Sequence, residues 1–102
     1  MKQLGGGILA VVFTWDRHKA ERNVQKHGVH FSEGCSVLDD PLSTTFPDED
    51  HPADEQRFVT VGMSESFRLM VVVHTDRGNT VRMISARVAT RRERQFYEET
   101  RH

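Results

Sequence analysis

Cysteine is nearly absent from this sequence, because Cys35 is the single one in 102 residues. The chain therefore cannot form an internal disulfide, and this usage is typical of a protein of the reducing cytoplasm. No apolar run approaches the roughly 18–20 residues that a membrane-spanning helix needs. The apolar stretch near the start lacks the features of a secretion signal. We interpret residues 1–12 as an N-terminal extension, expected to be partly flexible, and residues 13–102 as a single domain.

The sequence also lacks any recognised spacing of metal ligands. Its six histidines are scattered, and it contains neither a paired-cysteine motif nor an HExxH motif. The glycines at 5–7 are not followed by the Lys and Ser or Thr of a phosphate-binding P-loop. We therefore expect no metal and no other cofactor. Cys35 is interpreted as a small buried hydrophobic residue rather than a nucleophile.

Net charge is close to zero, with a formal value of -1, but the charges are segregated along the chain. Residues 1–32 carry five Lys or Arg and two acids, and residues 33–57 carry eight acids and one Arg. Residues 68–102 carry eight Arg and four acids. Two basic segments flank an acidic one, so the local charge is a better guide to binding partners than the net charge.

The first half of the chain contains start and stop signals for two helices. Asp16 is placed to cap a helix over residues 17–27, and Gly28 lies just past its end. Ser32 can cap a second, short helix that Pro41 terminates. Around these helices the sequence predicts a strand at 8–15, a brief strand at 42–46 and an acidic loop at 47–56.

The second half contains three β-branched, apolar runs with short turns between them. These predict strands at 57–63, 68–75 and 80–88, which form an antiparallel meander. A two-residue turn at Arg77-Gly78 would pair Thr75 with Thr80, although a bulge at Gly78 would shift this pairing by one residue. The register predicts one face made of Val71, Val73, Arg82 and Ile84, and an opposite face made of Arg68, Met70, Val72, His74, Met83, Ser85 and Arg87.

The C-terminal segment predicts a helix over residues 90–101. Thr90 and Glu93 have the spacing of a reciprocal capping box, and Phe96 and Tyr97 are the only apolar residues that can dock the helix. Together these elements predict an α+β fold.

Arginines gather where the last predicted strand ends and the last helix begins, at Arg87, Arg91, Arg92 and Arg94. A guanidinium group matches phosphate bidentately, and a helix N-terminus attracts anions, so the cluster is a candidate phosphate-binding surface. Arg82 lies earlier in the same predicted strand as Arg87 and is a further candidate. The alternative for Arg82 and Arg87 is an ion pair with Asp76, Glu93 or an acid of the middle segment, and the alternative for the helix arginines is that they are exposed to solvent.

Three other side chains are candidates for chemistry or for base recognition. His74 is a natural proton-transfer residue and shares the predicted face of Arg87, although a packed, hydrogen-bonded histidine explains it equally well. Glu93 is a candidate base, but its capping role already accounts for it. Tyr97 either stacks on a nucleobase or packs in the core.

Several motifs resemble, in order and spacing, the BrnT family of toxins from bacterial type II toxin–antitoxin systems. The motifs are "FTWDRHKAERNVQKHGV", "FSEG", "DDPLSTTFPD", "RFVTVG", "RLMVVVHT" and "ISARVATRRERQFYE". The resemblance implies a RelE-like α+β fold, in which two N-terminal helices pack on a small antiparallel β-sheet with a C-terminal helix. It also implies a metal-independent endoribonuclease that inhibits translation, and a BrnA-type ribbon-helix-helix antitoxin through which the complex would bind operator DNA.

Functional residues carry over only where a motif matches. The matching positions are Lys26 and His27 in "KHG", Arg87 in "ISAR", and Thr90, Arg91, Glu93 and Arg94 in "ATRRER". Together with the residues singled out by their chemistry, the candidate catalytic set is Arg87, His74, Glu93 and Arg91, and the candidate RNA-binding set is Lys26, His27, Arg82, Arg92, Arg94 and Tyr97. Two alternatives use the same basic surface: a non-enzymatic nucleic-acid-binding module or co-repressor, and a dock for an acidic antitoxin.

Overall fold

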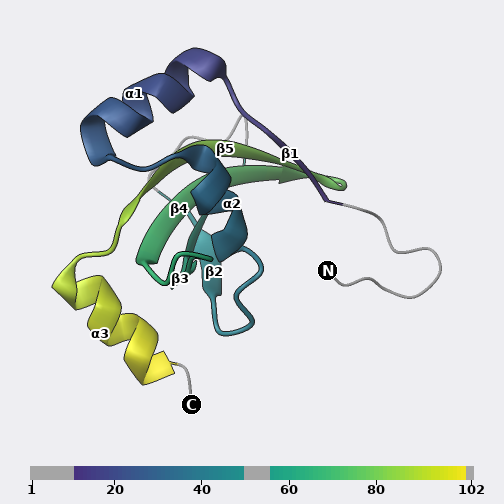
Figure 1. Cartoon of the computed structure of the whole chain (residues 1–102). Helices are drawn as coiled ribbons and strands as arrows, with labels where there is room; N and C mark the ends of the chain where they lie inside the picture. Colours follow the sequence, from purple (N-terminus) through teal and green to yellow (C-terminus); the bar gives the residue numbers. More distant parts are fainter. Residues whose placement is uncertain (1–10, 50–55, 101–102) are drawn as a thin grey trace.

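A computed structural model describes residues 11–49 and 56–100 (Figure 1). The order of elements is β1 (Val12–Thr14), α1 (Arg17–His27), α2 (Phe31–Val37), β2 (Thr44–Pro47), β3 (Arg57–Met63), β4 (Leu69–Arg77), β5 (Thr80–Val88) and α3 (Arg91–Thr100). The α+β fold and the predicted order of elements are confirmed. Strand β1 is shorter than the predicted strand, whose first residues lie outside the described part. Helix α2 ends at Val37, before Pro41, and the predicted Ser32 cap is wrong, because Ser32 lies inside the helix and His30 precedes it as the N-cap. Most of the predicted acidic loop also lies outside the described residues.

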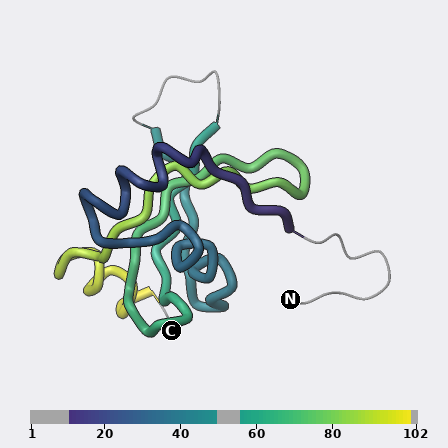
Figure 2. The backbone as a smooth tube through the Cα atoms, turned by 45° about the horizontal axis from the view of Figure 1, so that its top comes forward, coloured from purple at the N-terminus to yellow at the C-terminus, as the bar shows by residue number. Residues whose placement is uncertain are grey.

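The strands form one five-stranded sheet in the order β1-β5-β4-β3-β2. Strands β3 to β5 form the predicted antiparallel meander, β2 adds antiparallel to β3, and β1 pairs with β5 in parallel. The sheet is therefore mixed rather than wholly antiparallel. The tip of the β4–β5 hairpin extends beside β1 (Figure 2).

Both predicted caps of α1 are present. The Asp16 side chain accepts a hydrogen bond from the backbone N–H of Lys19 at 2.9 Å, which satisfies a free donor of the first turn. Gly28 adopts a left-handed conformation with φ of 69°, and its N–H donates to the carbonyl of Val24. A left-handed residue at this position favours glycine, so the sequence ends the helix where predicted.

The hairpin between β4 and β5 turns at Gly78-Asn79, not at Arg77-Gly78. Arg77 pairs with Thr80, and Thr75 pairs with Arg82 instead of Thr80. Gly78 has φ of 61°, which a tight two-residue turn requires at its first position and which glycine adopts without strain. The predicted register is thus wrong by two residues.

A β-bulge then changes which side chains share a face. Val73 pairs with Ser85 while the next residue, His74, pairs with Met83, so Ile84 is an extra residue in β5. Directly paired residues project from the same face of a sheet. Ser85 therefore lies on the face of Val73, whereas His74 lies on the opposite face.

The two faces of the sheet are covered by different helices. Helix α2 packs over one face, and the core beneath it contains Val29, Phe31, Val37, Met70, Val72, Met83 and Ala86. A Cβ atom on Gly34 of α2 would lie only 3.1 Å from Ala86, so the helix approaches the sheet closely at this glycine. Helix α3 covers one end of the other face, where Val61, Leu69, Val71 and Tyr97 form a smaller core. No helix in residues 11–49 and 56–100 is long and apolar enough to cross a membrane.

Helix α1 lies along the edge of β5 that extends beyond β1 (Figure 1). The buried Asn23 amide takes the place of a neighbouring strand there: its Nδ2 donates to the Ala86 carbonyl at 2.8 Å and its Oδ1 accepts from the Ala86 N–H at 3.2 Å. The same Nδ2 also donates to the Val29 carbonyl at 3.0 Å. Three hydrogen bonds from one side chain fix the position of α1 relative to the sheet.

Candidate functional site

The face of the sheet opposite α2, which we call the site face, presents three rows of side chains across β3, β4 and β5. Paired residues give each row: Arg57, Thr75 and Arg82; Val59, Val73 and Ser85; and Val61, Val71 and Arg87. Arginines thus lie at both ends of the face, with valines between them. At about 3.3 Å per residue the first and third rows are about 13 Å apart along β3.

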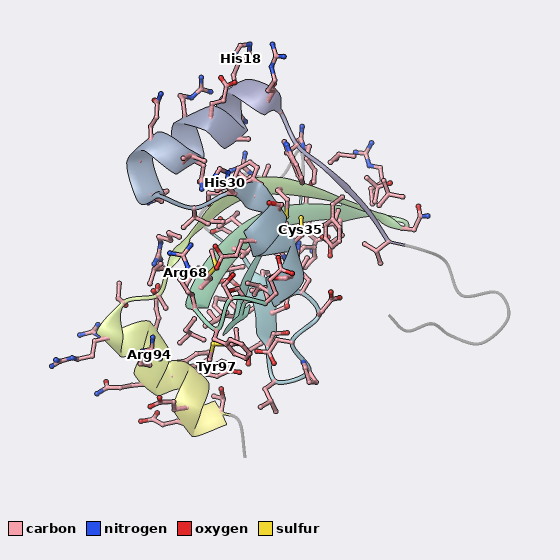
Figure 3. All side chains as sticks on the ribbon, viewed as in Figure 1. His18, His30, Cys35, Arg68, Arg94 and Tyr97 are labelled. Carbon is pink, nitrogen blue, oxygen red and sulfur yellow. The ribbon has the colours of Figure 1, made fainter. Side chains whose placement is uncertain are left out.

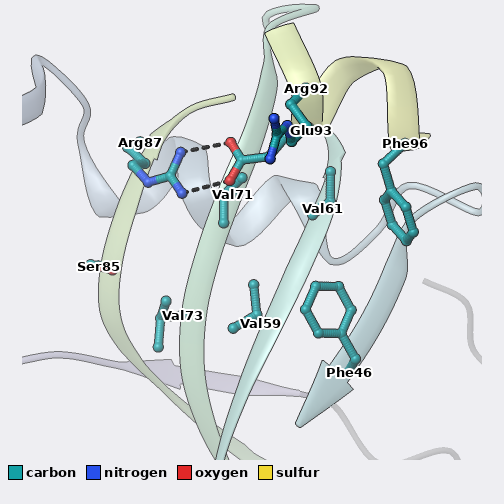
Figure 4. A pocket seen from close by; sticks show the side chains of 10 residues that line it. All are labelled: Phe46, Val59, Val61, Val71, Val73, Ser85, Arg87, Arg92, Glu93 and Phe96. Atoms are coloured by element: carbon teal, nitrogen blue, oxygen red, sulfur yellow. Dashed lines mark hydrogen bonds and ion pairs between the residues drawn. The ribbon is translucent and has the colours of Figure 1, made fainter. Parts of the chain in front are cut away.

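A hollow of about 410 Å³ covers the valine end of the site face (Figure 4). We call it the valine hollow; its lining residues are Phe46, Val59, Val61, Val71, Val73, Ser85, Arg87, Arg92, Glu93 and Phe96. Phe46 of β2 and Phe96 of α3 meet edge to face with ring centroids 6.2 Å apart. The hollow therefore combines an apolar floor and two partly exposed aromatic rings with a charged rim.

Arg87 is paired with Glu93 across this rim. Arg87 Nη1 donates to Glu93 Oε1 at 2.8 Å and Nη2 donates to Oε2 at 2.7 Å. Glu93 Oε1 also accepts the Thr90 N–H at 2.8 Å, and the Glu93 N–H donates to Thr90 Oγ1 at 3.2 Å. The predicted capping box is confirmed, and so is the ion pair weighed as the alternative role of Arg87.

Hydrogen bonds from Arg87 lower the pKa of Glu93 to about 2, with the Thr90 N–H acting in the same direction. Such a carboxylate is a weak base near neutral pH, because a general base works best with a pKa near the working pH. The two hydrogen bonds of Glu93 also fix the orientation of the Arg87 guanidinium.

A second hollow, of about 390 Å³, lies between α1 and β5, and we call it the basic groove. Its lining residues are Lys19, Arg22, Asn23, Lys26, His27, Arg57, Ile84 and Ser85. Ser85 also lines the valine hollow, so the two hollows adjoin on the site face. The groove contains the two predicted RNA-binding residues of α1, Lys26 and His27.

His74 does not lie with Arg87. It is 2% exposed on the α2 side of the sheet, where its Nε2 is 2.8 Å from Thr60 Oγ1 and its Nδ1 is 2.6 Å from Asp76 Oδ1. Its ring also stacks on Phe58 at 6.0 Å. The prediction that His74 and Arg87 share a face is wrong. The extra residue Ile84 reverses the face on which the following residues of β5 project, relative to β4.

Tyr97 is packed in the core rather than exposed for base stacking. It is 4% exposed and projects from α3 toward the sheet (Figure 3). Its hydroxyl donates to Asp40 Oδ2 at 2.8 Å, and the same carboxylate oxygen accepts the Met63 N–H at 2.8 Å. Tyr97 therefore anchors α3 and with it the arginines of the first turn.

The remaining predicted residues are exposed at separate places. Arg92 borders the valine hollow, while Arg91 and Arg94 lie on the solvent side of α3. Arg82 lies in a third hollow, of about 210 Å³, with Arg77 at the hairpin end of the site face. The four clustered arginines thus do not converge on one point.

Cys35 was predicted to be a buried residue rather than a nucleophile, and it is half-buried in α2. Burial raises the pKa of the half-buried Cys35 thiol to about 11, which disfavours the nucleophilic thiolate. Within the described residues, no three His, Cys, Asp or Glu side chains are grouped to hold a metal ion.

Sequence reasoning missed several residues that line the hollows. Lys19 and Arg22 precede Lys26 by seven and four positions, which is the spacing of one helix face and was a detectable signal. Arg57 had no such signal, because it meets α1 only through the folded sheet. Phe46 and Phe96 likewise come together from distant segments.

Comparison with known proteins agrees with this fold. The sequence matches the family described as "Ribonuclease toxin, BrnT, of type II toxin-antitoxin system" over residues 15–93. The structure is similar to the 1.1 Å crystal structure of the ribonuclease toxin BrnT of Brucella abortus, with a TM-score of 0.63 and 25% sequence identity over 80% of this chain and 100% of that one. The search of curated proteins finds no match. The chain belongs to the BrnT family of type II toxin–antitoxin ribonuclease toxins.

Proposed function

We propose that this chain is a metal-independent endoribonuclease that cleaves RNA on the site face and thereby inhibits translation. Family membership supports an RNA target and an antitoxin partner. The observation that carries the proposal is the pair of adjoining hollows, which share Ser85 and bring cations of α1, β3, β5 and α3 to one face. Such a surface suits RNA, because the cations can bind its phosphates and the two aromatic rings of the valine hollow can stack on its bases.

The proposed reaction uses the RNA's own 2′-hydroxyl group as the nucleophile. The 2′ oxygen forms a bond to the adjacent phosphorus, the bond from phosphorus to the 5′ oxygen breaks, and the products are a 2′,3′-cyclic phosphate and a 5′-hydroxyl. The 2′-hydroxyl proton goes to a base, and the 5′ oxygen takes a proton from water. The protein supplies orientation and positive charge for the phosphorane-like transition state.

Arg87 is the residue that we assign to the transition-state charge; it borders the valine hollow two residues along β5 from Ser85, which both hollows share. Glu93 holds its guanidinium in one orientation through two hydrogen bonds, so its remaining donors have a defined direction. The Arg87 side chain is 37% exposed and therefore accessible to a phosphate. Arg92 extends the cationic rim, and Arg91 and Arg94 contribute longer-range attraction from α3.

The test is to incubate the purified chain with RNA in the presence of EDTA. Cleavage is expected, together with growth arrest when the chain is expressed without its antitoxin. Intact RNA and unaffected growth would overturn the proposal. Arg87→Ala separates the enzyme from the alternative of a non-enzymatic binding module or co-repressor: lost cleavage with retained RNA binding supports the enzyme.

The proposed antitoxin is of the BrnA type, with a ribbon-helix-helix domain that contacts operator DNA for the complex. An antitoxin that covers the cationic site face would neutralise the toxin by excluding RNA. The proposal predicts that a co-expressed partner of this type copurifies with the chain and protects RNA from it. A gene for such a protein next to that of the toxin would be the simplest supporting observation.

A further inference from the structure

The proposed reaction requires a group that accepts the 2′-hydroxyl proton, and the structure removes two candidates. Both carboxylate oxygens of Glu93 already accept hydrogen bonds from Arg87, and one of them also accepts the Thr90 N–H, which makes Glu93 a weak base. His74 is enclosed on the α2 side of the sheet, away from both hollows. Of the predicted site residues, His27 is the other histidine, and it lines the basic groove on the site face.

His27 lies in the wall of the basic groove, in the last turn of α1. It follows Asn23 by four residues, so the two side chains occupy neighbouring positions on one face of the helix. Because Asn23 is bonded to both backbone groups of Ala86, this face of α1 is held against β5. Gly28 ends the helix directly after His27. The His27 side chain thus lines the groove beside the strand that also carries Ser85 and Arg87.

The groove around His27 is suited to a phosphodiester. Lys19, Arg22 and Lys26 reach it from α1, and Arg57 reaches it from β3. Among the described residues, those that line the groove include no Asp or Glu. Ser85 lies where the groove meets the valine hollow. A phosphate bound beside His27 would therefore lie next to the part of the site face that carries Arg87.

We propose that His27 is the general base of the ribonuclease reaction and that the scissile phosphate binds in the basic groove between α1 and β5. This assignment rests on the proposed ribonuclease function. The neutral imidazole of His27 takes the proton of the 2′-hydroxyl group as the 2′ oxygen attacks phosphorus. The P–O5′ bond breaks, the 5′ oxygen takes a proton from water, and His27 returns its proton to water. Lys26 and Arg57 hold the phosphate oxygens in the groove, and Arg87, two residues from Ser85 on β5, stabilises the charge that develops on them.

The test compares His27→Ala with His18→Ala, a matched change at the exposed start of the same helix. Cleavage of unmodified RNA is measured at saturating RNA, and affinity is measured with a 2′-O-methyl RNA that lacks the nucleophile. His27→Ala is expected to lower the rate by roughly 10²–10⁴-fold, the usual contribution of a general base, without changing the affinity for 2′-O-methyl RNA. His18→Ala should change neither quantity.

Added imidazole provides a readout that a structural role would not affect. It should restore part of the rate of His27→Ala and should not restore the rate of Arg57→Gln. If His27→Ala folds poorly, His27→Gln tests the same loss of rate while keeping a polar side chain.

A wild-type rate in His27→Ala would overturn the assignment of His27 but not the ribonuclease proposal. The same holds if His27→Ala loses RNA affinity to an extent that explains its lower rate and added imidazole does not restore the rate. Intact RNA with the wild-type protein would overturn both.

Discussion

Arg87 and Glu93 join the last strand to the last helix through two parallel hydrogen bonds. The pair lies at the point where β5 ends and α3 begins, and Glu93 also caps the helix through Thr90. One carboxylate thus fixes the start of α3 and the direction of the guanidinium that borders the valine hollow. Stability and function are expected to depend on this pair in different ways.

The first prediction concerns pH and Glu93. Its pKa is near 2 in the folded chain and has an ordinary value of 4.5, so the pair contributes its full stability above pH 4.5 and loses it as the pH falls toward 2. Glu93→Gln should lower the free energy of unfolding at pH 7 by about 1 kcal/mol, since the pair is partly exposed. Urea unfolding at pH 7 and pH 3 measures this, and the difference from wild type should shrink at pH 3. Glu98→Gln, an exposed change on the same helix, is the control; a pH-independent difference for Glu93→Gln would contradict the assignment.

The second prediction separates packing from base stacking at Tyr97. Tyr97→Phe removes a hydroxyl that donates to the Asp40 carboxylate but keeps the buried ring. We expect the free energy of unfolding to fall by about 1.5–3 kcal/mol, the range for a hydrogen bond to a charged group. RNA affinity, measured at a temperature where both proteins are folded, should not change. A weaker RNA affinity without loss of stability would show that Tyr97 contributes to RNA binding.

The third prediction tests the basic groove by salt dependence. Arg22 lines the groove, whereas Arg17 is exposed on the other side of α1. Each phosphate contact to single-stranded nucleic acid contributes about 0.7 to the slope of log affinity against log salt concentration. Arg22→Gln should lower the slope for 2′-O-methyl RNA by about 0.7, and adding Lys19→Gln by about 1.4 in total. Arg17→Gln should leave the slope unchanged, and equal effects of Arg17→Gln and Arg22→Gln would show that the groove is not the binding site.

The fourth prediction assigns His74 to the fold. His74→Phe keeps a ring on Phe58 but loses the hydrogen bonds to Thr60 and Asp76, so the free energy of unfolding should fall by about 1–3 kcal/mol. The cleavage rate at saturating RNA should stay near wild type in the folded variant. Unfolding curves and single-turnover cleavage measure the two effects. A stable, folded His74→Phe with a strongly reduced rate would place His74 in the chemistry.

Local signals predicted the elements of this fold well. Asp16 and Gly28 bound α1, and Thr90 with Glu93 begin α3, because caps depend on residues within a few positions of each other. The family was also evident from motifs spread over most of the chain.

Relationships across the sheet were harder to predict. Gly78-Asn79 is a recognised two-residue turn signal, and the error of two residues there leaves the faces unchanged. The extra residue at Ile84 decides which face His74 shares, and it leaves no clear pattern in β5. Arg57 enters the groove and Tyr97 meets Asp40 only through long-range packing. Short-range spacing carries no information on such contacts, so the candidate site was only partly predictable.

The most direct test of the ribonuclease proposal is to identify the ends of RNA fragments produced in EDTA by wild type and by Arg87→Ala. Wild type is predicted to leave 2′,3′-cyclic phosphate and 5′-hydroxyl ends. Arg87→Ala should form them roughly 10²–10³-fold more slowly, the usual cost of removing one donor to a transition-state oxyanion. Fragments with 3′-hydroxyl ends, or an equal rate from Arg87→Ala, would contradict the proposed chemistry on the site face.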